Sequence, residues 1–137
     1  MTFYEKELRT MFEHNDVIYD AKFSGKTMLG KLDDELRVKL QFVTGILADH
    51  YNAIRATIIN RKEGVVDQQL FRFSDIIGMQ KRRDMSDIEP HIWEYGGKPE
   101  WYVPITASAK AQIADTVLDY VGMYRQEENM GMTEMNM

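Results

Sequence analysis

The sequence contains no cysteine among its 137 residues. It therefore has no disulfide framework, no zinc site built from thiolates and no cysteine nucleophile. It also lacks long apolar runs. The first ten residues, MTFYEKELRT, carry charges where a signal peptide needs an apolar core, and no later run approaches the length of a membrane span. We therefore expect a soluble, cytoplasmic protein without membrane contact.

The chain lacks the excess of Lys and Arg that is typical of proteins that coat nucleic acids. Its 17 Lys and Arg against 22 Asp and Glu give a formal net charge of −5. Since phosphate binding relies on Lys and Arg, this balance argues against a general DNA coat, although it allows a local basic patch. The length and an ordinary composition, with 44% hydrophobic and 28% charged residues, fit a single globular domain.

Sequence motifs for nucleotide binding, metal binding and catalysis are missing. SGKTMLGK contains Gly-Lys-Thr, but a phosphate-binding loop needs a glycine where Asp20 stands and must open a helix. His14, His50 and His91 lie far apart, without a ligand spacing such as HxxxH, and no serine lies in a Gly-x-Ser-x-Gly turn. We therefore expect no catalytic residue, no metal site and no cofactor. The sequence favours a non-enzymatic protein, while an active site assembled from distant residues stays an alternative.

Hydrophobic periodicity predicts an α+β fold. Thr2 followed by Glu5 forms a capping box, and apolar residues at helical spacing predict a helix over about 3–13. Alternation then predicts three antiparallel strands, in 17–23, TMLGKL and LRVKLQFV, joined by tight turns. A last helix is predicted over about 107–125. The expected architecture is an antiparallel sheet, a meander plus hairpins, with the N-terminal and C-terminal helices packed on one face.

The segment 46–60 leaves two alternatives open. It fits one helix, or a short helical turn near 46–52 followed by a hairpin that pairs about 54–60 with 68–73. The β-branched residues of IRATII favour the hairpin. GMQKRRDMSDIEP predicts a loop. Residues 126–137 are rich in methionine and lack periodicity, so we expect a disordered tail after a single domain over 1–125.

Four cations of the meander are the first candidates for binding a partner. If the strands pair as predicted, Lys22, Lys31, Arg37 and Lys39 project to the same side of the sheet. The resulting positive stripe could contact phosphates or an acidic partner. A half-buried sheet also needs a solvated face, however, and lysines on it are expected on that ground alone.

The aromatic segment HIWEYGGKPEWYV provides the second group of candidates. Its proline cannot donate to a strand ladder, so a four-residue loop GGKP would place Trp93 opposite Tyr102. A two-residue loop would instead pair Ile92 with Trp101, so the register stays open. Trp93, Tyr95 and Tyr102 either stabilise the hairpin through cross-strand contacts or form a binding surface.

The segments RVKLQFVT, EGVVDQQLFRFSDIIG and HIWEYGGKPEWYV occur in this order. Together they resemble a group of small uncharacterised proteins of conjugative and other mobile elements in Gram-positive gut bacteria. The resemblance covers about residues 20–122. It implies a cytoplasmic accessory protein of a mobile element, and it carries over no activity and no functional residues.

Three hypotheses of function follow. The first is a non-enzymatic interaction or regulatory protein that binds a protein partner. The mobile-element setting, implied only by the resemblance, would suit an inhibitor of a host defence protein. The second is a nucleic-acid-binding protein that uses the basic strand face and the aromatic hairpin. The third is a small enzyme without a recognisable motif. Exposed aromatic rings could also form the contact of a homodimer.

Overall fold

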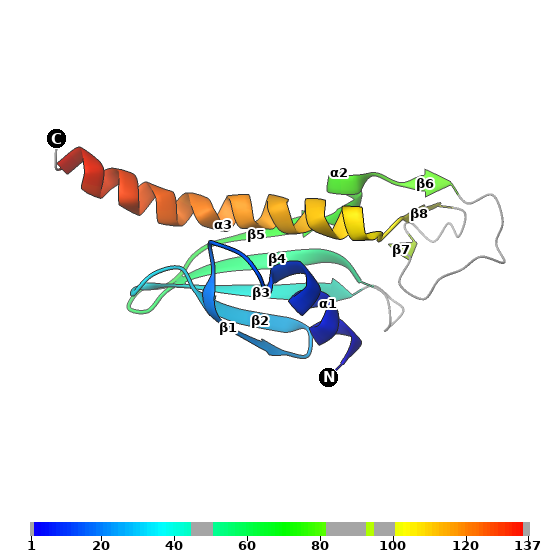
Figure 1. The fold of residues 1–137 in the computed structure, drawn as a ribbon, viewed down its shortest axis with the longest axis horizontal. Helices are drawn as coiled ribbons and strands as arrows, with labels where there is room; N and C mark the ends of the chain where they lie inside the picture. The colour runs from blue at the N-terminus through cyan, green and yellow to red at the C-terminus, as the bar shows by residue number, and fades with distance from the viewer. Residues whose placement is uncertain (1, 45–50, 82–92, 95–100, 136–137) are drawn as a thin grey trace.

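The computed structural model describes residues 2–44, 51–81, 93–94 and 101–135. Five antiparallel strands form one sheet in chain order: β1 (Tyr19–Ser24), β2 (Thr27–Lys31), β3 (Leu36–Thr44), β4 (Tyr51–Asn60) and β5 (Gly64–Arg72). Helix α1 (Phe3–Phe12) precedes this sheet and α3 (Ala107–Met135) ends the described chain (Figure 1). Between them lie α2 (Phe73–Ile77) and a small sheet of β6 (Gln80–Lys81), β8 (Trp101–Val103) and β7 (Trp93–Glu94). The predicted α+β class and the antiparallel meander are confirmed.

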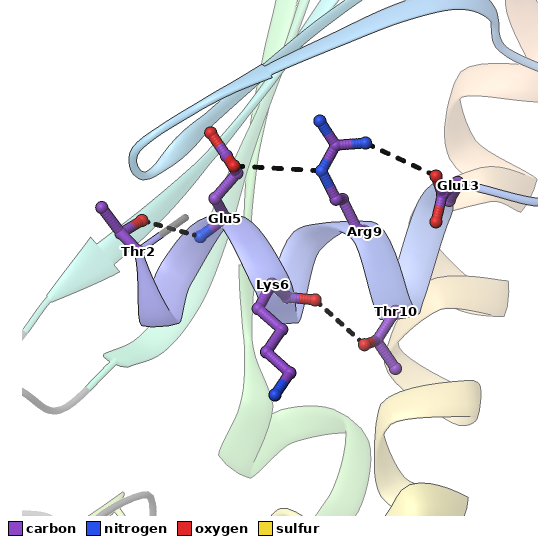
Figure 2. A network of polar contacts seen from close by, with 6 residues as sticks. All are labelled: Thr2, Glu5, Lys6, Arg9, Thr10 and Glu13. Carbon is purple, nitrogen blue, oxygen red and sulfur yellow. Dashed lines mark hydrogen bonds and ion pairs between the residues drawn. The ribbon is translucent and has the colours of Figure 1, made fainter.

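Helix α1 begins as the sequence predicts. The Thr2 hydroxyl accepts a hydrogen bond from the Glu5 backbone N–H at 3.1 Å, which satisfies one of the free N–H groups of the first turn (Figure 2). Further along, Arg9 lies between two carboxylates, 3.9 Å from Glu5 and 3.4 Å from Glu13 (Figure 2). Its guanidinium carbon is also 4.6 Å from the ring centroid of Phe23 on β1. The contact with Phe23 connects α1 to β1, an edge strand of the sheet.

The hydrophobic core lies on one face of the five-stranded sheet. All three helices contribute to it, as do alternate residues of the strands, because successive side chains of a strand point to opposite faces. The predicted packing of the N-terminal and C-terminal helices on one face is thereby confirmed. The largest side chains that are fully buried in this core are Leu8, Phe12, Met28, Leu32, Val38, Leu40, Ile54, Ile58, Phe73, Val103 and Ile113.

A β-bulge interrupts the predicted strand over 17–23. The register between β1 and β2 shifts between Tyr19 and Lys22, and Asp20 adopts a positive φ of 54°. Tyr19 therefore pairs with Lys31 on the face away from the core, whereas Phe23 pairs with the buried Met28. The regular alternation expected over 17–23 is therefore interrupted, because the extra residue of a bulge reverses the faces of the residues before it.

The hairpin alternative for the middle of the chain is confirmed. Strand β4 pairs with β5 over its length, and the buried Ile54 is opposite Phe71. The predicted helical turn falls mostly on 45–50, outside the described residues, and Tyr51 already begins β4. The predicted second strand, 68–73, is too late at both ends, because β5 begins at Gly64 and Phe73 opens the unpredicted helix α2.

Helix α3 and the aromatic hairpin both depart from expectation. The helix continues to Met135, ten residues beyond the predicted end near 125, through a segment rich in the good helix formers Gln, Glu and Met. The division into a domain over 1–125 and a tail over 126–137 stays a prediction. In the hairpin, Trp93 pairs with Val103 and Glu94 with Tyr102. Both predicted registers are therefore wrong, and β8 also pairs with β6, a strand that the sequence did not predict.

Candidate functional site

The face of the five-stranded sheet opposite the core is the main candidate surface. Within the described residues all three helices pack on the other face, and the strand register fixes which side chains this one carries. We call it the open sheet face. It consists of Tyr19, Lys22, Ser24, Thr27, Leu29, Lys31, Arg37, Lys39, Gln41, Val43, Ala53, Arg55, Thr57, Ile59, Val65, Gln68, Leu70 and Arg72.

The open sheet face is basic on a protein with a net charge of −5. The register brings together all four cations expected from the sequence, Lys22, Lys31, Arg37 and Lys39. Two further cations share the face: Arg55 on β4, and Arg72, which is exposed on β5. Neither was predicted from the sequence. The alternation of Arg55 and Thr57 in IRATII, the segment whose composition favours a strand, is the pattern that could have identified Arg55.

Lys31 and Arg37 are directly opposite each other on β2 and β3. Like charges in such positions repel, and local contacts relieve this pair. Arg37 Nη1 turns back to the main chain and donates to the carbonyl oxygen of Asp33 at 2.7 Å. Lys31 Nζ lies 3.4 Å from the carboxylate of Asp20 at the bulge. Lys31 is therefore partly neutralised by Asp20, and the Arg37 guanidinium is held by main-chain carbonyls.

Lys39 and Arg55 differ from that pair because, among the described residues, neither has the carboxylate or carbonyl contacts that hold Lys31 and Arg37. Lys39 is opposite Thr57, and Arg55 is opposite Gln41, so the two cations occupy diagonal positions on adjacent strands. Such neighbours are roughly 7–8 Å apart, within reach of long side chains. Both are partly buried, and among the described residues neither forms an ion pair. The centre of the open sheet face therefore carries uncompensated positive charge.

Apolar side chains are interspersed with these cations. Leu29 is 50% exposed and Leu70 is 39% exposed, although strands usually bury large aliphatic side chains. Between β5 and β4, Gln68 Nε2 donates a hydrogen bond of 2.9 Å to the hydroxyl of the buried Thr57. The surface thus combines cations, exposed aliphatic groups and amides.

The aromatic candidates belong to a different part of the fold. Trp93 and Tyr102 lie on β7 and β8 of the small sheet, whereas the cations lie on the five-stranded sheet. Trp93 is opposite Val103 and not opposite Tyr102, so the predicted pairing of Trp93 with Tyr102 is wrong. Tyr95 lies outside the described residues. The two groups of predicted residues are consequently not on one sheet face.

A groove of about 330 Å³ lies between α1 and α3. Its polar lining includes Thr10, His14, Lys110 and Asp115. The Lys110 ammonium is 2.6 Å from the carboxylate of Glu7 and is therefore neutralised. Within the described residues, the groove shows neither a nucleophile held by a base nor a pair of carboxylates. Its geometry gives no support to catalysis.

Asp67 on the edge strand β5 is hydrogen-bonded to two tyrosines of α3. Asp67 Oδ2 accepts hydrogen bonds from the hydroxyls of Tyr124 and Tyr120, the latter at 2.8 Å. The bond from Tyr124, followed by that from Tyr120, lowers the pKa of Asp67 below its ordinary value. Burial raises the pKa of Tyr120, and the neighbouring carboxylate raises it further. The cluster therefore holds a stable carboxylate with neutral tyrosines, which suits a structural tether better than proton transfer at neutral pH.

No metal-binding cluster of three or more His, Cys, Asp or Glu side chains occurs among the described residues. No helix in the described part of the chain is long and apolar enough to span a membrane. The sequence matches no protein-family model, no curated protein and no solved structure. The open sheet face is therefore the main indication of function.

Proposed function

We propose that the protein is a non-enzymatic interaction module that binds an acidic surface of a protein partner through its open sheet face. The observation that carries the proposal is the diagonal pair Lys39 and Arg55, which lies at the centre of the face without a carboxylate partner among the described residues. A partner carboxylate placed between them would offset their mutual repulsion. Such a charge-assisted contact favours association and fixes orientation.

The exposed aliphatic groups support a protein partner over a simple polyanion. Leu29 and Leu70 flank the cationic centre on the second and fifth strands. An acidic protein surface with apolar residues could bury these side chains while it pairs with the cations. Aliphatic burial supplies affinity, at roughly 25 cal/mol per Å² of apolar area, whereas charge pairs supply specificity and association rate.

Nucleic-acid binding is the second candidate, because phosphates are attracted by the same cations. Sheets that bind single strands also present aromatic rings on which bases stack. On the described part of the open sheet face, strands β2 to β5 present no aromatic side chain. Tyr19 on β1 is 42% exposed, but the guanidinium of Arg125 lies over its ring at 5.7 Å. The face therefore fits a protein partner better than unpaired bases.

The resemblance to proteins of mobile elements suggests a biological setting for this binding. In that setting the module would be a cytoplasmic accessory protein that regulates a partner, for instance by covering the functional surface of a host defence protein. This part of the proposal rests on the resemblance alone.

Two labelled probes of equal formal charge test the proposal: an acidic peptide of alternating glutamate and leucine, and a single-stranded oligothymidine. Their affinities are measured by fluorescence anisotropy for the wild type and for Lys39→Glu/Arg55→Glu. The control variant, Lys6→Glu/Lys62→Glu, changes net charge equally but alters exposed residues of α1 and of the β4–β5 turn. We expect the first variant to weaken peptide binding by at least about tenfold, or ~1.4 kcal/mol, and the control to leave it nearly unchanged.

Three results would overturn this reading. Failure of the wild type to bind the peptide would contradict the proposed binding of an acidic protein surface. Equal losses in both variants would show that net charge alone governs binding. Tighter binding of oligothymidine, with an affinity that falls steeply with salt, would transfer the function of this face to nucleic-acid binding.

A further inference from the structure

Strand β5 forms one edge of the five-stranded sheet. It pairs with β4 on one side, and no described strand pairs with its other side. The strand is nine residues long, and its register with β4 is unbroken from Asp67 to Arg72. Gln68, Gln69 and Leu70 are all exposed, although consecutive residues point to opposite faces. Exposure on both faces indicates that this edge of the sheet is uncovered.

Natural proteins usually protect an edge strand with a bulge, a proline, a lysine or an inward-pointing charge. The first part of β5 has such protection, because its register shifts beside Val65 and the charged Asp67 points to the core face. The segment from Gln68 to Arg72 contains no bulge, no proline and no lysine. A regular, uncovered edge of this kind is a template for pairing with another strand.

Charge decides which surfaces of two copies could meet. Two open sheet faces would place their cations against each other, which disfavours contact through that face. The segment Gln68–Phe71, in contrast, carries no charge and includes the exposed Leu70. We propose that β5 pairs in antiparallel orientation with β5 of a second copy, so that two five-stranded sheets become one continuous ten-stranded sheet.

The regular segment also selects a register for this dimer. In an antiparallel pair, residues that lie opposite each other have side chains on the same face. A two-fold axis perpendicular to the sheet must therefore pass between one residue and the same residue of the second copy. An axis at Leu70 pairs the whole bulge-free segment from Gln68 to Arg72 with itself. It places Leu70 beside Leu70 of the second copy, and Arg72 opposite the neutral Gln68 of the second copy. No like charges are then directly opposite.

The dimer has a consequence for binding. A two-fold axis perpendicular to the sheet leaves both open sheet faces on the same side. The cationic centres around Lys39 and Arg55 of the two copies would then lie on one extended surface, which could contact two acidic sites of one partner or of a symmetric partner. The pairing of β5 itself does not depend on the proposed function.

The mass of the full chain in solution tests the dimer, by light scattering coupled to size exclusion over a wide range of protein concentration. One chain has a mass of 16.0 kDa, so twice that mass is expected for the wild type. Leu70→Lys places two ammonium groups beside the axis and is expected to give the mass of one chain. The matched control Leu29→Lys alters a residue that is 50% exposed on the same face, but on β2, and is expected to remain a dimer.

Circular dichroism of each variant shows that the change in mass is not caused by unfolding. A wild type with the mass of one chain at all concentrations overturns the dimer, and so does a Leu70→Lys variant that is folded and still has the doubled mass. Hydrogen exchange adds a second measurement. The β5 amides that point away from β4 are expected to exchange faster in Leu70→Lys than in the wild type, and equal rates in the two also contradict the pairing. None of these results depends on the peptide probe, so the dimer and the proposed function can fail separately.

Discussion

Lys39 on β3 and Arg55 on β4 occupy diagonal positions on the open sheet face, and neither forms an ion pair with any described residue. The neighbouring cations Lys31 and Arg37 have local counter-groups, at Asp20 and at main-chain carbonyls. Among the described residues, Asp20 thus pairs with Lys31 near one end of the strands, whereas Lys39 and Arg55 at the centre have no carboxylate partner. Unrelieved repulsion of this kind is typical of binding surfaces, where stability is lower than it could be.

Replacement of Lys39 by methionine is expected to stabilise the protein. Lys39→Met keeps an unbranched side chain over the sheet and removes the repulsion with Arg55, for a gain of roughly 0.2–1 kcal/mol in the free energy of unfolding. Urea unfolding measures this change. Affinity for the acidic peptide should fall at the same time. Lys62→Met in the exposed β4–β5 turn is the control and should change neither quantity. A loss of stability in Lys39→Met would contradict the account.

Gly30 allows a close approach that no larger residue fits. A Cβ added at Gly30 would lie 2.3 Å from Cγ2 of Ile18, which is buried in the core. Gly30→Ala is therefore expected to destabilise the protein by about 1–3 kcal/mol, as is typical of overpacking. Chemical unfolding at equilibrium measures the loss.

Gly122 on α3 provides the matched comparison. A Cβ there would make only ordinary contacts, with the nearest atom of Val17 at 3.7 Å. Because alanine favours helix more than glycine does, Gly122→Ala is expected to stabilise the protein by about 0.5–1 kcal/mol. Equal effects of the two substitutions would contradict the packing of Ile18 on Gly30.

The Asp67 cluster predicts a dependence of stability on pH. Hydrogen bonds from Tyr124 and Tyr120 hold the folded-state pKa of Asp67 below its ordinary value of 3.8. The carboxylate therefore stabilises the fold fully at neutral pH, and this contribution is lost as the pH falls from the ordinary value through the lowered one.

Urea unfolding of the wild type and of Asp67→Asn at a series of pH values measures this contribution. The difference in stability should be largest near neutral pH and should shrink in acid below 3.8. Tyr124→Phe should reduce the same difference, because it removes the donor that lowers the pKa most. A difference that does not vary with pH would show that the carboxylate charge makes no contribution.

The cap of α1 gives a separate prediction for stability. Thr2→Ala removes the acceptor of the Glu5 N–H and is expected to lower the free energy of unfolding by about 1 kcal/mol. Thr2→Ser keeps the hydroxyl and should behave like the wild type. If both variants are equally destabilised, the loss arises from the threonine methyl group and not from the cap.

Much of the fold could be predicted because local patterns specify it. The alternation of LRVKLQFV places Val38 and Leu40 in the core and Arg37 and Lys39 outside, as the structure has them. The structure differs from the prediction where the local pattern is interrupted or where distant segments pair. The bulge at Asp20 reverses the faces of β1, and the register of β7 with β8 differs from both registers that the loop sequence predicted.

The four basic candidates of the meander were predictable for the same reason, since strand alternation assigns each residue to a face. The sequence alone thus predicted the strands of the meander, the cap of α1 and the separation of apolar from charged faces in β3, because these depend on neighbouring residues. Only the tertiary structure decided that Arg55 joins Lys39 on the open sheet face, that α2 and β6 follow β5, and that the edge of β5 is unpaired within the described chain. Those features depend on contacts between segments that are far apart in the chain. A local sequence pattern does not show how favourable such contacts are.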